Sequence, residues 1–453
     1  MKEHQYDTED LIAALATPWA SSALAVIRTG GEGCIRALAT VFSQADQLLK
    51  AGSGKMVYGY LKDREGAGVD QVMMAVFHTG HGYTGQESVE IHCHGSLPGI
   101  QRILELLRAQ GFRDAAPGEF TLRAFLNGRM DLTRAEAVQE IVSAKTLRAQ
   151  SLALNRLAGG VWRRIDAFKL QLRKILAVIE LQLDYPEDEL EEVPEIPPEE
   201  IEVLRREIDG LSATYRTGRL FQEGVTVALA GPTNAGKSSL FNLFLREDRS
   251  IVSGVHGTTR DYIESWISIS GVPVRLFDTA GLRVSEHPVE AEGIRRSTRI
   301  IENAAMVIYI VDGTEGLSDE DIEVAERYRS DRRYLFVWNK TDLSAQALPE
   351  GWYPLSAETG EGFPRLEEEL GKRILGSDPG QGEVMIDSRR QQDLLNRSAE
   401  ALDRALLALK EGLSFDFLAA DLKEALDALG EITGEVTSAD ILNQIFGDFC
   451  VGK

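Results

Sequence analysis

The strongest constraint on the fold of this chain is the glycine-rich segment Gly231–Ser238, GPTNAGKS. It follows the apolar run Val225–Ala230 and precedes an apolar-periodic stretch that begins near Ser239. The main-chain amides of such a loop, with the N-terminus of the next helix, surround phosphate oxygens. Lys237 can reach the terminal phosphates, and Ser238 can coordinate Mg²⁺. The segment therefore predicts a nucleoside triphosphate site at the end of a buried strand.

Further motifs follow in the order that guanine-nucleotide binding requires. Asp278–Gly281 (DTAG) comes directly after an apolar strand, which places a carboxylate where it can hold Mg²⁺. Asn339–Asp342 (NKTD) follows another apolar strand, and Asp342 can accept hydrogen bonds from the guanine N1–H and 2-amino groups, which adenine lacks. Ser356–Ala357 supplies a supporting loop, and Thr259 is the expected second Mg²⁺ ligand. The residues that these motifs place against GTP are Asn234, Ala235, Gly236, Lys237, Ser238, Ser239, Ser253, Gly254, Val255, His256, Gly257, Thr258, Thr259, Asp278, Thr279, Ala280, Gly281, Asn339, Lys340, Thr341, Asp342, Ser356, Ala357 and Glu358.

The segment after Gly281 lacks a familiar part of the hydrolytic machinery. Leu282 stands where many GTPases carry a glutamine that orients the attacking water. Because an apolar side chain cannot orient water, we expect another polar group to do so, and Glu286–Glu292 offers carboxylates. Asn234 and the carbonyl groups of residues 253–258 can cage K⁺ against the phosphates in place of an arginine finger. Equal turnover in KCl and NaCl would reject this hypothesis.

The hydrophobic periodicity changes three times along the chain. Short apolar runs punctuated by glycines predict an α+β domain over residues 1–118. Amphipathic periodicity, as in Ala135–Arg156, predicts helices over residues 119–222. Buried strands alternating with helices predict a doubly wound α/β unit over residues 223–377. Helical periodicity returns over residues 378–453, so the α/β unit is predicted to be inserted into one helical domain with its ends close together.

Composition limits the partners and the compartment. The net charge of −22 opposes binding of nucleic acid or anionic membrane by the whole surface, so any nucleic-acid contact must be local. Residues 101–180 carry 14 Lys and Arg against 8 Asp and Glu, which suits either an RNA-facing surface or a solvated helical face. Three cysteines are too few for a disulfide framework and indicate a reducing cytoplasm. No run approaches the roughly 18 apolar residues of a membrane span.

Three segments outside the nucleotide motifs carry a family resemblance. They are Tyr83–Gly95 (YTGQESVEIHCHG), Pro117–Leu132 (PGEFTLRAFLNGRMDL) and Cys450–Lys453 (CVGK). Together with the nucleotide motifs they resemble the MnmE (TrmE) family of tRNA modification GTPases, over essentially the whole chain. The resemblance implies a multidomain α/β protein: an N-terminal α+β folate-binding-like domain that forms a homodimer, a helical central domain and an inserted Ras-like P-loop GTPase domain.

The resemblance also implies a chemical role. It implies an enzyme that works with the flavin-dependent MnmG (GidA) protein to attach an aminomethyl or carboxymethylaminomethyl group to carbon 5 of the wobble uridine of certain tRNAs. The one-carbon unit would come from a tetrahydrofolate in its 5,10-methylene or 5-formyl form. Arg28, Glu90, Arg129 and Lys453 match the family's folate-contacting positions, although the family more often has Lys at the position of Arg129. Whether the added group derives from glycine or ammonia stays open.

By the same mapping, catalytic roles fall on Lys237, Glu290 and Cys450. Glu290 resembles the family's catalytic glutamate, with Glu292 as the competing candidate. Cys450 matches the family's reactive thiol, yet a lone tail cysteine can equally be inert. The positions that resemble K⁺ ligands are Asn234, Ser253, Val255 and Thr258, and those for Mg²⁺ are Ser238 and Thr259.

Other interpretations compete with the functional ones given above. His92, Cys93 and His94 could suggest a metal site, but adjacent strand residues point to opposite faces, which favours packing. A ribosome-assembly switch GTPase without one-carbon chemistry would carry the same nucleotide motifs. Folate binding by residues 1–118 would distinguish the two functions. A third reading, a nucleotide-binding structural protein, would be excluded by measurable turnover.

Overall fold

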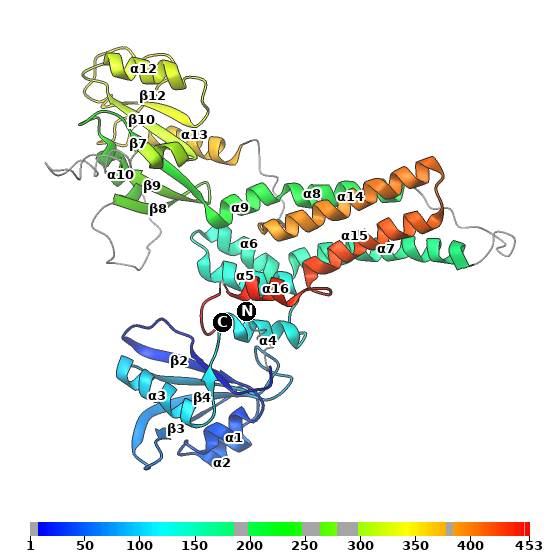
Figure 1. Ribbon diagram of the computed structural model, residues 1–453. Helices are drawn as coiled ribbons and strands as arrows, with labels where there is room; N and C mark the ends of the chain where they lie inside the picture. The colour runs from blue at the N-terminus through cyan, green and yellow to red at the C-terminus, as the bar shows by residue number, and fades with distance from the viewer. Residues whose placement is uncertain (1–7, 185–197, 247–262, 279–297, 377–383, 448) are drawn as a thin grey trace. The chain divides into compact units, whose positions relative to one another are not determined.

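The computed structural model describes residues 8–184, 198–246, 263–278, 298–376, 384–447 and 449–453 (Figure 1). The chain divides into two compact units. The first unit is Met1–Gln139 with Gly430–Lys453, and the second is Glu140–Leu429. No helix within the described ranges is long and apolar enough to cross a membrane.

The first unit is built on a six-stranded sheet with helices against one face. Its strands, in chain order, are β1 (Ile12–Leu15), β2 (Ser22–Gly30), β3 (Lys55–Lys62), β4 (Gly68–Phe77), β5 (Ser88–Gly95) and β6 (Arg113–Asp114). They lie in the order β3-β4-β5-β2-β1-β6, and every neighbouring pair is antiparallel except β1 and β6. Helices α1 (Cys34–Ala39), α2 (Ala45–Lys50) and α3 (Leu97–Ala109) bury Leu38, Leu48 and Ile103 against this sheet.

The opposite face of the sheet is exposed near its β3 edge. Val57 and Leu61 point into the core, and the alternating residues Met56, Tyr58 and Tyr60 are 48%, 56% and 47% exposed. Alternation of this kind is expected of a strand with one buried and one open face. β3 is the last strand in the sheet order, but residues 41–43 already bond part of its outer edge: the Ser43 amide donates to the Tyr60 carbonyl and the Lys62 amide to the Val41 carbonyl, both at 2.9 Å. We call the exposed side chains Met56, Tyr58, Tyr60 and Met73 the β3 face.

Helices α4 (Glu119–Leu126), α5 (Leu132–Ser143) and α16 (Ala439–Gly447) follow the sheet. A buried ion network fixes the first turn of α4. The Glu119 carboxylate pairs with Arg113 at 2.6 Å and with Arg123 at 2.8 Å, and it accepts the Ala116 amide at 2.9 Å. Arg123, which is 1% exposed, also pairs with Asp10. The network therefore ties α4 to the segment that leads into β1.

The second unit contains a mixed six-stranded sheet with helices on its faces (Figure 1, green to yellow). Its strands are β7 (Val225–Ala230), β8 (Ile263–Ile269), β9 (Val272–Asp278), β10 (Met306–Asp312), β11 (Tyr334–Asn339) and β12 (Tyr353–Pro354), and its helices are α10 (Lys237–Arg246), α12 (Asp319–Tyr328) and α13 (Phe363–Leu375). The strand order is β12-β11-β10-β7-β9-β8, with β8 alone antiparallel to its neighbour. Val227, Leu276 and Ile308 are fully buried between sheet and helices. The predicted doubly wound α/β unit is confirmed.

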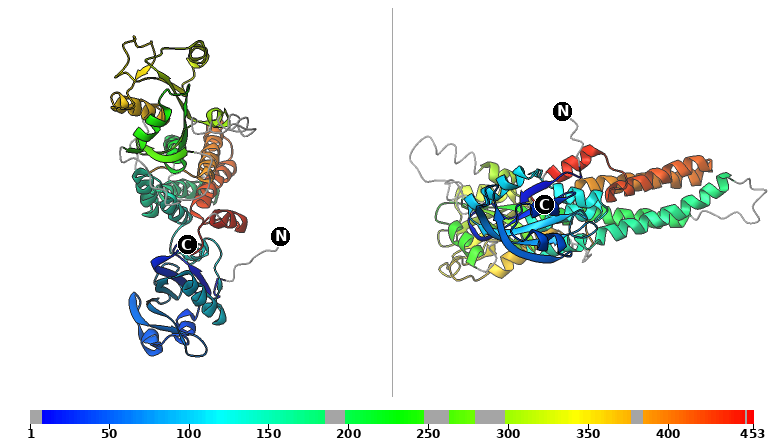
Figure 2. Two further views of the ribbon diagram at one scale, coloured as in Figure 1. Left: turned by 90° about the vertical axis from the view of Figure 1, so that its left-hand side faces the viewer. Right: turned by 90° about the horizontal axis from the view of Figure 1, so that it is seen from below.

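The remainder of the second unit is helical. It comprises α6 (Leu147–Leu157), α7 (Gly160–Asp184), α8 (Pro198–Ala213), α9 (Tyr215–Glu223), α14 (Arg389–Glu411) and most of α15 (Phe415–Thr433). Helix α8 packs along α14, and the two run side by side in Figure 1; Figure 2 shows the same elements from two further directions. The long amphipathic periodicities of the sequence therefore form helices, as predicted.

One predicted helix is wrong. Residues 135–156 do not form a single helix, because α5 ends at Ser143 and α6 begins at Leu147. Thr146 causes the new start: its hydroxyl accepts the Ala149 amide at 3.1 Å as an N-cap and donates to the Gly271 carbonyl at 2.8 Å. The partner at Gly271 is far away in sequence, so local periodicity cannot reveal the break.

The segments that flank the α/β unit lie against each other. The Ile386 amide donates to Thr214 Oγ1 at 3.1 Å, and a Cβ atom at Gly218 would lie 2.1 Å from the Ile386 carbonyl oxygen. The buried Arg156 donates to the Met385 carbonyl at 3.1 Å and pairs with Asp387 at 2.8 Å. This contact, which we call the stem, supports the predicted insertion with its ends close together. The exact domain limits stay predictions.

Candidate guanine-nucleotide site

The phosphate loop runs between β7 and α10, and its backbone requires glycine at both ends. Gly231 has φ +131°, and a Cβ atom there would lie 2.0 Å from the Ile310 carbonyl oxygen. Gly236 has φ +98°, and a Cβ atom would lie 2.1 Å from the Asn339 side-chain nitrogen. Any side chain would therefore push the loop off β10 and off Asn339.

Two side chains at the start of α10 face this loop. Lys237 is 6% exposed, and its ammonium group donates to the Gly231 carbonyl at 2.9 Å and to the Pro232 carbonyl. The Ser238 hydroxyl donates to Asp278 Oδ2 at 2.6 Å, and Asp278 is 3% exposed at the end of β9. A hydroxyl and a carboxylate side by side are the hard oxygen donors that Mg²⁺ prefers. The geometry thus brings together two of the predicted metal-site residues.

Asn339 joins the phosphate loop to the loops expected to hold the base. Its side chain is 1% exposed, donates to the Ala235 carbonyl at 2.7 Å and accepts the Ala357 amide at 3.0 Å. The Thr341 amide donates to the Leu355 carbonyl at 3.2 Å. Asp342 is exposed nearby in the chain, as expected of a side chain that reads a base edge. The segments Asn339–Asp342 and Ser356–Ala357 are therefore joined to each other and to the phosphate loop.

Asp312 is a residue that the sequence interpretation missed. It ends β10, is 7% exposed, and its carboxylate pairs with Lys340 and accepts the Thr314 hydroxyl at 2.6 Å. Its position in the sequence could have identified it, because an acidic residue at the end of a buried strand lies at the edge of the sheet where the other motifs gather.

A second constellation lies in the first unit, where the three family-like segments meet. Arg28 Nη2 pairs with Glu90 at 2.9 Å, and Arg28 Nη1 donates to the Gly452 carbonyl at 3.1 Å. The Arg28 guanidinium also lies 5.2 Å from the ring centre of Tyr83 and 5.6 Å from that of Phe120. The structure thus brings Arg28 and Glu90 into direct contact beside the 450–453 tail.

The N-terminus of α4 holds that tail by its main chain. The Phe120 amide donates to the Lys453 main-chain oxygen at 3.1 Å, and the Gly118 amide donates to the Cys450 carbonyl at 3.5 Å. Cys450 is exposed. Arg129, three residues beyond the end of α4, donates to the Gly80 carbonyl at 3.4 Å, in the turn before Tyr83.

Two protein-family models match the chain. The model of the MnmE helical domain matches residues 132–450, and that of the GTP-binding protein TrmE N-terminus matches residues 11–129. The tRNA modification GTPase MnmE of Borrelia recurrentis (strain A1) is 41% identical over 463 residues, which is 99% of this chain and 99% of the relative. The chain belongs to the MnmE family. Its fellow members from Carboxydothermus hydrogenoformans and Moorella thermoacetica are 38% and 40% identical, each over 98% of this chain and 100% of the relative.

Membership of the MnmE family confirms the predicted fold class and enzyme class. The chain has a TrmE-type N-terminal domain, an MnmE helical domain and a P-loop GTPase domain. The name shared by the relatives, tRNA modification GTPase, agrees with the guanine-nucleotide motifs. The protein is a GTPase.

Several predicted residues of the MnmE-type site lie outside the described residues. They are Ser253, Gly254, Val255, His256, Gly257, Thr258, Thr259, Thr279, Ala280, Gly281, Glu290 and Glu292. The second Mg²⁺ ligand, the catalytic glutamate and three of the four K⁺ ligands therefore stay predictions. Asn234, the fourth K⁺ candidate, is described and has a left-handed φ of +62°.

The His-Cys-His run of the N-terminal sheet divides between two faces. Cys93 is 1% exposed, and burial raises its thiol pKa to about 11. His94 points outward and pairs with Asp70 at 2.7 Å. Among the described residues, no group of three or more His, Cys, Asp or Glu side chains could hold a metal ion.

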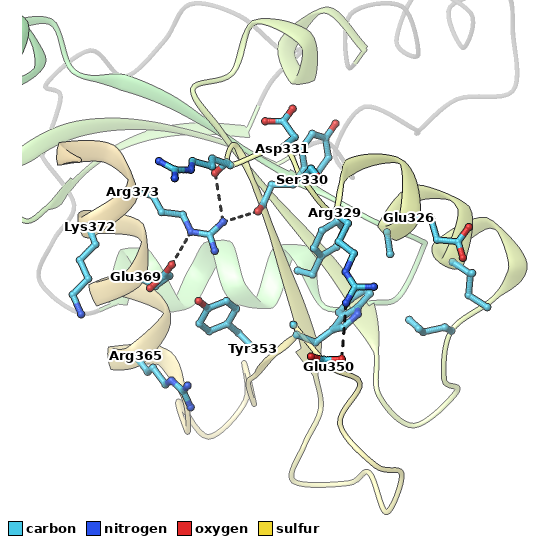
Figure 3. A pocket seen from close by; sticks show the side chains of 18 of the residues that line it. Glu326, Arg329, Ser330, Asp331, Glu350, Tyr353, Arg365, Glu369, Lys372 and Arg373 are labelled. Atoms are coloured by element: carbon cyan, nitrogen blue, oxygen red, sulfur yellow. Dashed lines mark hydrogen bonds and ion pairs between the residues drawn. The ribbon is translucent and has the colours of Figure 1, made fainter. Parts of the chain in front are cut away.

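A large cleft of about 1080 Å³ opens between α12 and α13 (Figure 3). None of its lining residues belongs to the nucleotide motifs. Much of its charge is internally paired: Arg373 pairs with Glu369 at 2.7 Å and donates to the Tyr334 carbonyl at 2.7 Å, and Arg329 lies 3.9 Å from Glu350. We assign no ligand to this cleft.

Proposed function

We propose that this protein binds and hydrolyses GTP to drive modification of the wobble uridine of tRNA. The observation that carries the proposal is the double role of Asn339, which bonds the phosphate loop through Ala235 and the base-side loop through Ala357. A site built this way holds both ends of a nucleotide in one rigid frame. The substrate class comes from the relatives, whose shared name is tRNA modification GTPase.

The chain's own groups divide the work on GTP. Lys237 exchanges its carbonyl partners for phosphate oxygens and neutralises their charge, while Ser238 and Thr259 would hold Mg²⁺ directly and Asp278 would hold it through water. Bound Mg²⁺ supplies electrostatic stabilisation of the charge that develops on the phosphates. Asp342 selects guanine through the N1–H and 2-amino groups. If the purified protein did not bind GDP or GTP, or preferred adenine nucleotides, this assignment would be overturned.

Hydrolysis is proposed to depend on K⁺ and on a carboxylate from the segment after the DTAG motif. Asn234, Ser253, Val255 and Thr258 are the proposed K⁺ ligands, and Glu290, with Glu292 as the competitor, is the proposed group that orients water. Since Leu282 cannot orient water, the carboxylate must. We expect turnover in KCl to exceed that in NaCl, and Glu290→Gln to abolish hydrolysis while Glu292→Gln keeps it. The reverse ranking of the two variants would exchange their roles.

The first unit is proposed to bind a tetrahydrofolate, in its 5,10-methylene or 5-formyl form, as the one-carbon donor. A carboxylate such as Glu90 can grip the donor edge of a pterin, and cations can grip the glutamate tail. Arg28, Arg129 and Lys453 are the proposed cations. The contact of Arg28 with Glu90 and with the tail carbonyl supports this, because it gathers three family segments around one charged pair. Titration with 5-formyltetrahydrofolate tests it, and Glu90→Gln should weaken binding.

The proposed partners are a second copy of the chain, the flavoprotein MnmG (GidA) and tRNA. The β3 face, an exposed surface of aromatic and methionine side chains, supports association of two N-terminal domains. A reducing cytoplasm is the proposed compartment. Mass spectrometry of tRNA wobble nucleosides from cells that lack the gene tests the whole proposal. Unchanged modified uridine would favour the ribosome-assembly switch instead.

A further inference from the structure

The carboxylate of Asp312 is fully engaged at the edge of the sheet where the nucleotide motifs gather. One oxygen, Oδ2, pairs with the Lys340 ammonium group. The other, Oδ1, accepts the Thr314 amide at 2.9 Å and the Thr314 hydroxyl at 2.6 Å. Burial alone would raise the pKa of Asp312, but the hydrogen bonds from Lys340 and Thr314 outweigh it and hold the pKa below its usual value. The group is therefore a buried, charged anchor.

Lys340 adopts a backbone conformation that needs support. Its φ is +62°, in the left-handed region that side chains other than glycine rarely enter. The residue stands inside the NKTD segment, between Asn339, which is fixed to the phosphate loop, and Asp342. Because Asp342 follows Lys340 by two residues, the direction in which it is presented depends on this strained turn.

The turn after β10 grips the NKTD loop by its main chain as well. The Gly313 amide donates to the Asn339 carbonyl at 2.8 Å, and the Ser344 hydroxyl donates to the Gly313 carbonyl at 2.5 Å. The Ser344 amide in turn donates to the Lys340 carbonyl at 3.0 Å. Main-chain and side-chain contacts therefore clamp the same loop, and the Asp312–Lys340 pair is the charged member of that clamp.

We propose that Asp312 is a positioning residue for guanine recognition, which acts through Lys340 to hold the turn that presents Asp342 to the base. The proposal rests on the guanine-site assignment made above. The proposal divides nucleotide affinity into two parts. Phosphate binding depends on the loop Gly231–Ser238 and does not involve Asp312. Recognition of the guanine 2-amino group by Asp342 depends on Asp312. Loss of the charge should therefore reduce base discrimination more than phosphate binding.

Asp312→Asn in the full-length protein tests this, because the amide keeps the size and removes the charge. The dissociation constants of GDP and of inosine diphosphate, which lacks the 2-amino group, are measured by competition. We expect GDP affinity to fall about tenfold, as for a lost charged hydrogen bond, and the preference for GDP over inosine diphosphate to shrink severalfold. The matched control is Asp321→Asn, a buried aspartate that caps α12 and accepts the Tyr309 hydroxyl at 2.8 Å. It should leave the preference unchanged.

Lys340→Met removes the more exposed charge of the same ion pair, and it replaces Asp312→Asn as the test if that variant does not fold. If Asp312 acts through Lys340, the double variant should bind GDP about as well as the weaker single variant. Equal losses of GDP and inosine diphosphate affinity, or additive losses in the double variant, would overturn the proposal. Failure of the unaltered protein to prefer GDP to ADP would instead overturn the guanine site itself, so the two failures are distinguishable.

Discussion

Asn339 is a buried amide whose two partners come from different loops. Asn339→Ala would leave the Ala235 carbonyl and the Ala357 amide without their side-chain partner, which costs about 1–3 kcal/mol per buried group. We expect GDP affinity to fall by at least about tenfold, measured by titration with a fluorescent nucleotide. The matched control is Asn303→Ala, whose exposed amide donates to the Arg299 carbonyl within one helical turn. Unchanged affinity in Asn339→Ala would contradict the connected frame.

Glu119 makes the stability of the first unit depend on pH. Burial would raise the pKa of its carboxyl, but Arg113, the Ala116 amide and Arg123 hold the pKa below its usual value. A depressed native pKa means that the unfolded chain takes up the proton first as pH falls. The stabilisation is therefore complete above the unfolded pKa of about 4.3 and is lost as pH falls through the lower native value.

The corresponding variant is Glu119→Gln, which leaves Arg123 buried with less compensation. We expect it to lower the unfolding free energy at neutral pH by about 3–5 kcal/mol and to flatten the loss of stability in acid. Calorimetric unfolding at several pH values measures both. Glu105→Gln, an exposed carboxylate on α3 that accepts the Gln101 amide, is the control. A variant that keeps the acid-induced loss would show that other carboxylates cause it.

At the scale of elements, the β8–β9 hairpin is held against the start of α6. Thr146 caps α6 and donates to Gly271 at the hairpin turn, and the Lys145 ammonium group lies 3.3 Å from the ring centre of Trp266. Burial lowers the pKa of Lys145, with a smaller contribution from Arg275. Since β9 ends at Asp278, this contact links the helical part to the strand that carries a predicted metal-site residue.

Thr146→Val tests that contact with little change in volume. Loss of the cap and of the bond to Gly271 should lower the unfolding free energy by about 1 kcal/mol and alter the fluorescence of Trp266. Denaturant unfolding and emission spectra give the two readouts. Thr298→Val, within the helical residues 298–303 of the same unit, is the control, and an equal spectral change there would refute the assignment.

Those elements show what local sequence can and cannot reveal. Strands such as Met306–Asp312 were predictable because the buried run is only seven residues long and is rich in β-branched Val and Ile. The break before α6 was not, because Thr146 finds its partner at Gly271 only in the folded chain. The candidate site shows the same contrast. The NKTD motif can be recognised in the sequence, whereas the pairing of Asp312 with Lys340 spans 28 residues and follows no motif.

For the whole molecule, the β3 face predicts the assembly state. Tyr58→Glu with Tyr60→Glu would place charges in the middle of this exposed apolar face and should disfavour association of two copies through it. We expect the unaltered protein to sediment as a dimer at micromolar concentration and the double variant as a monomer that still binds GDP. Leu407→Glu, an equally exposed apolar residue on α14, is the control and should stay dimeric. A monomeric parent protein would refute the prediction.

The stem has a practical meaning. Because Thr214, Gly218 and Arg156 hold the returning chain at Met385–Asp387, the nucleotide-binding unit enters and leaves the helical part at one place, like a cassette. Removing residues 225–383 and bridging the gap with a short glycine linker should leave a protein that still folds. The excised cassette, made alone, should still bind GDP. Such a module could then be exchanged between relatives, to test whether the rate of GTP hydrolysis follows the nucleotide-binding unit or the helices that carry it.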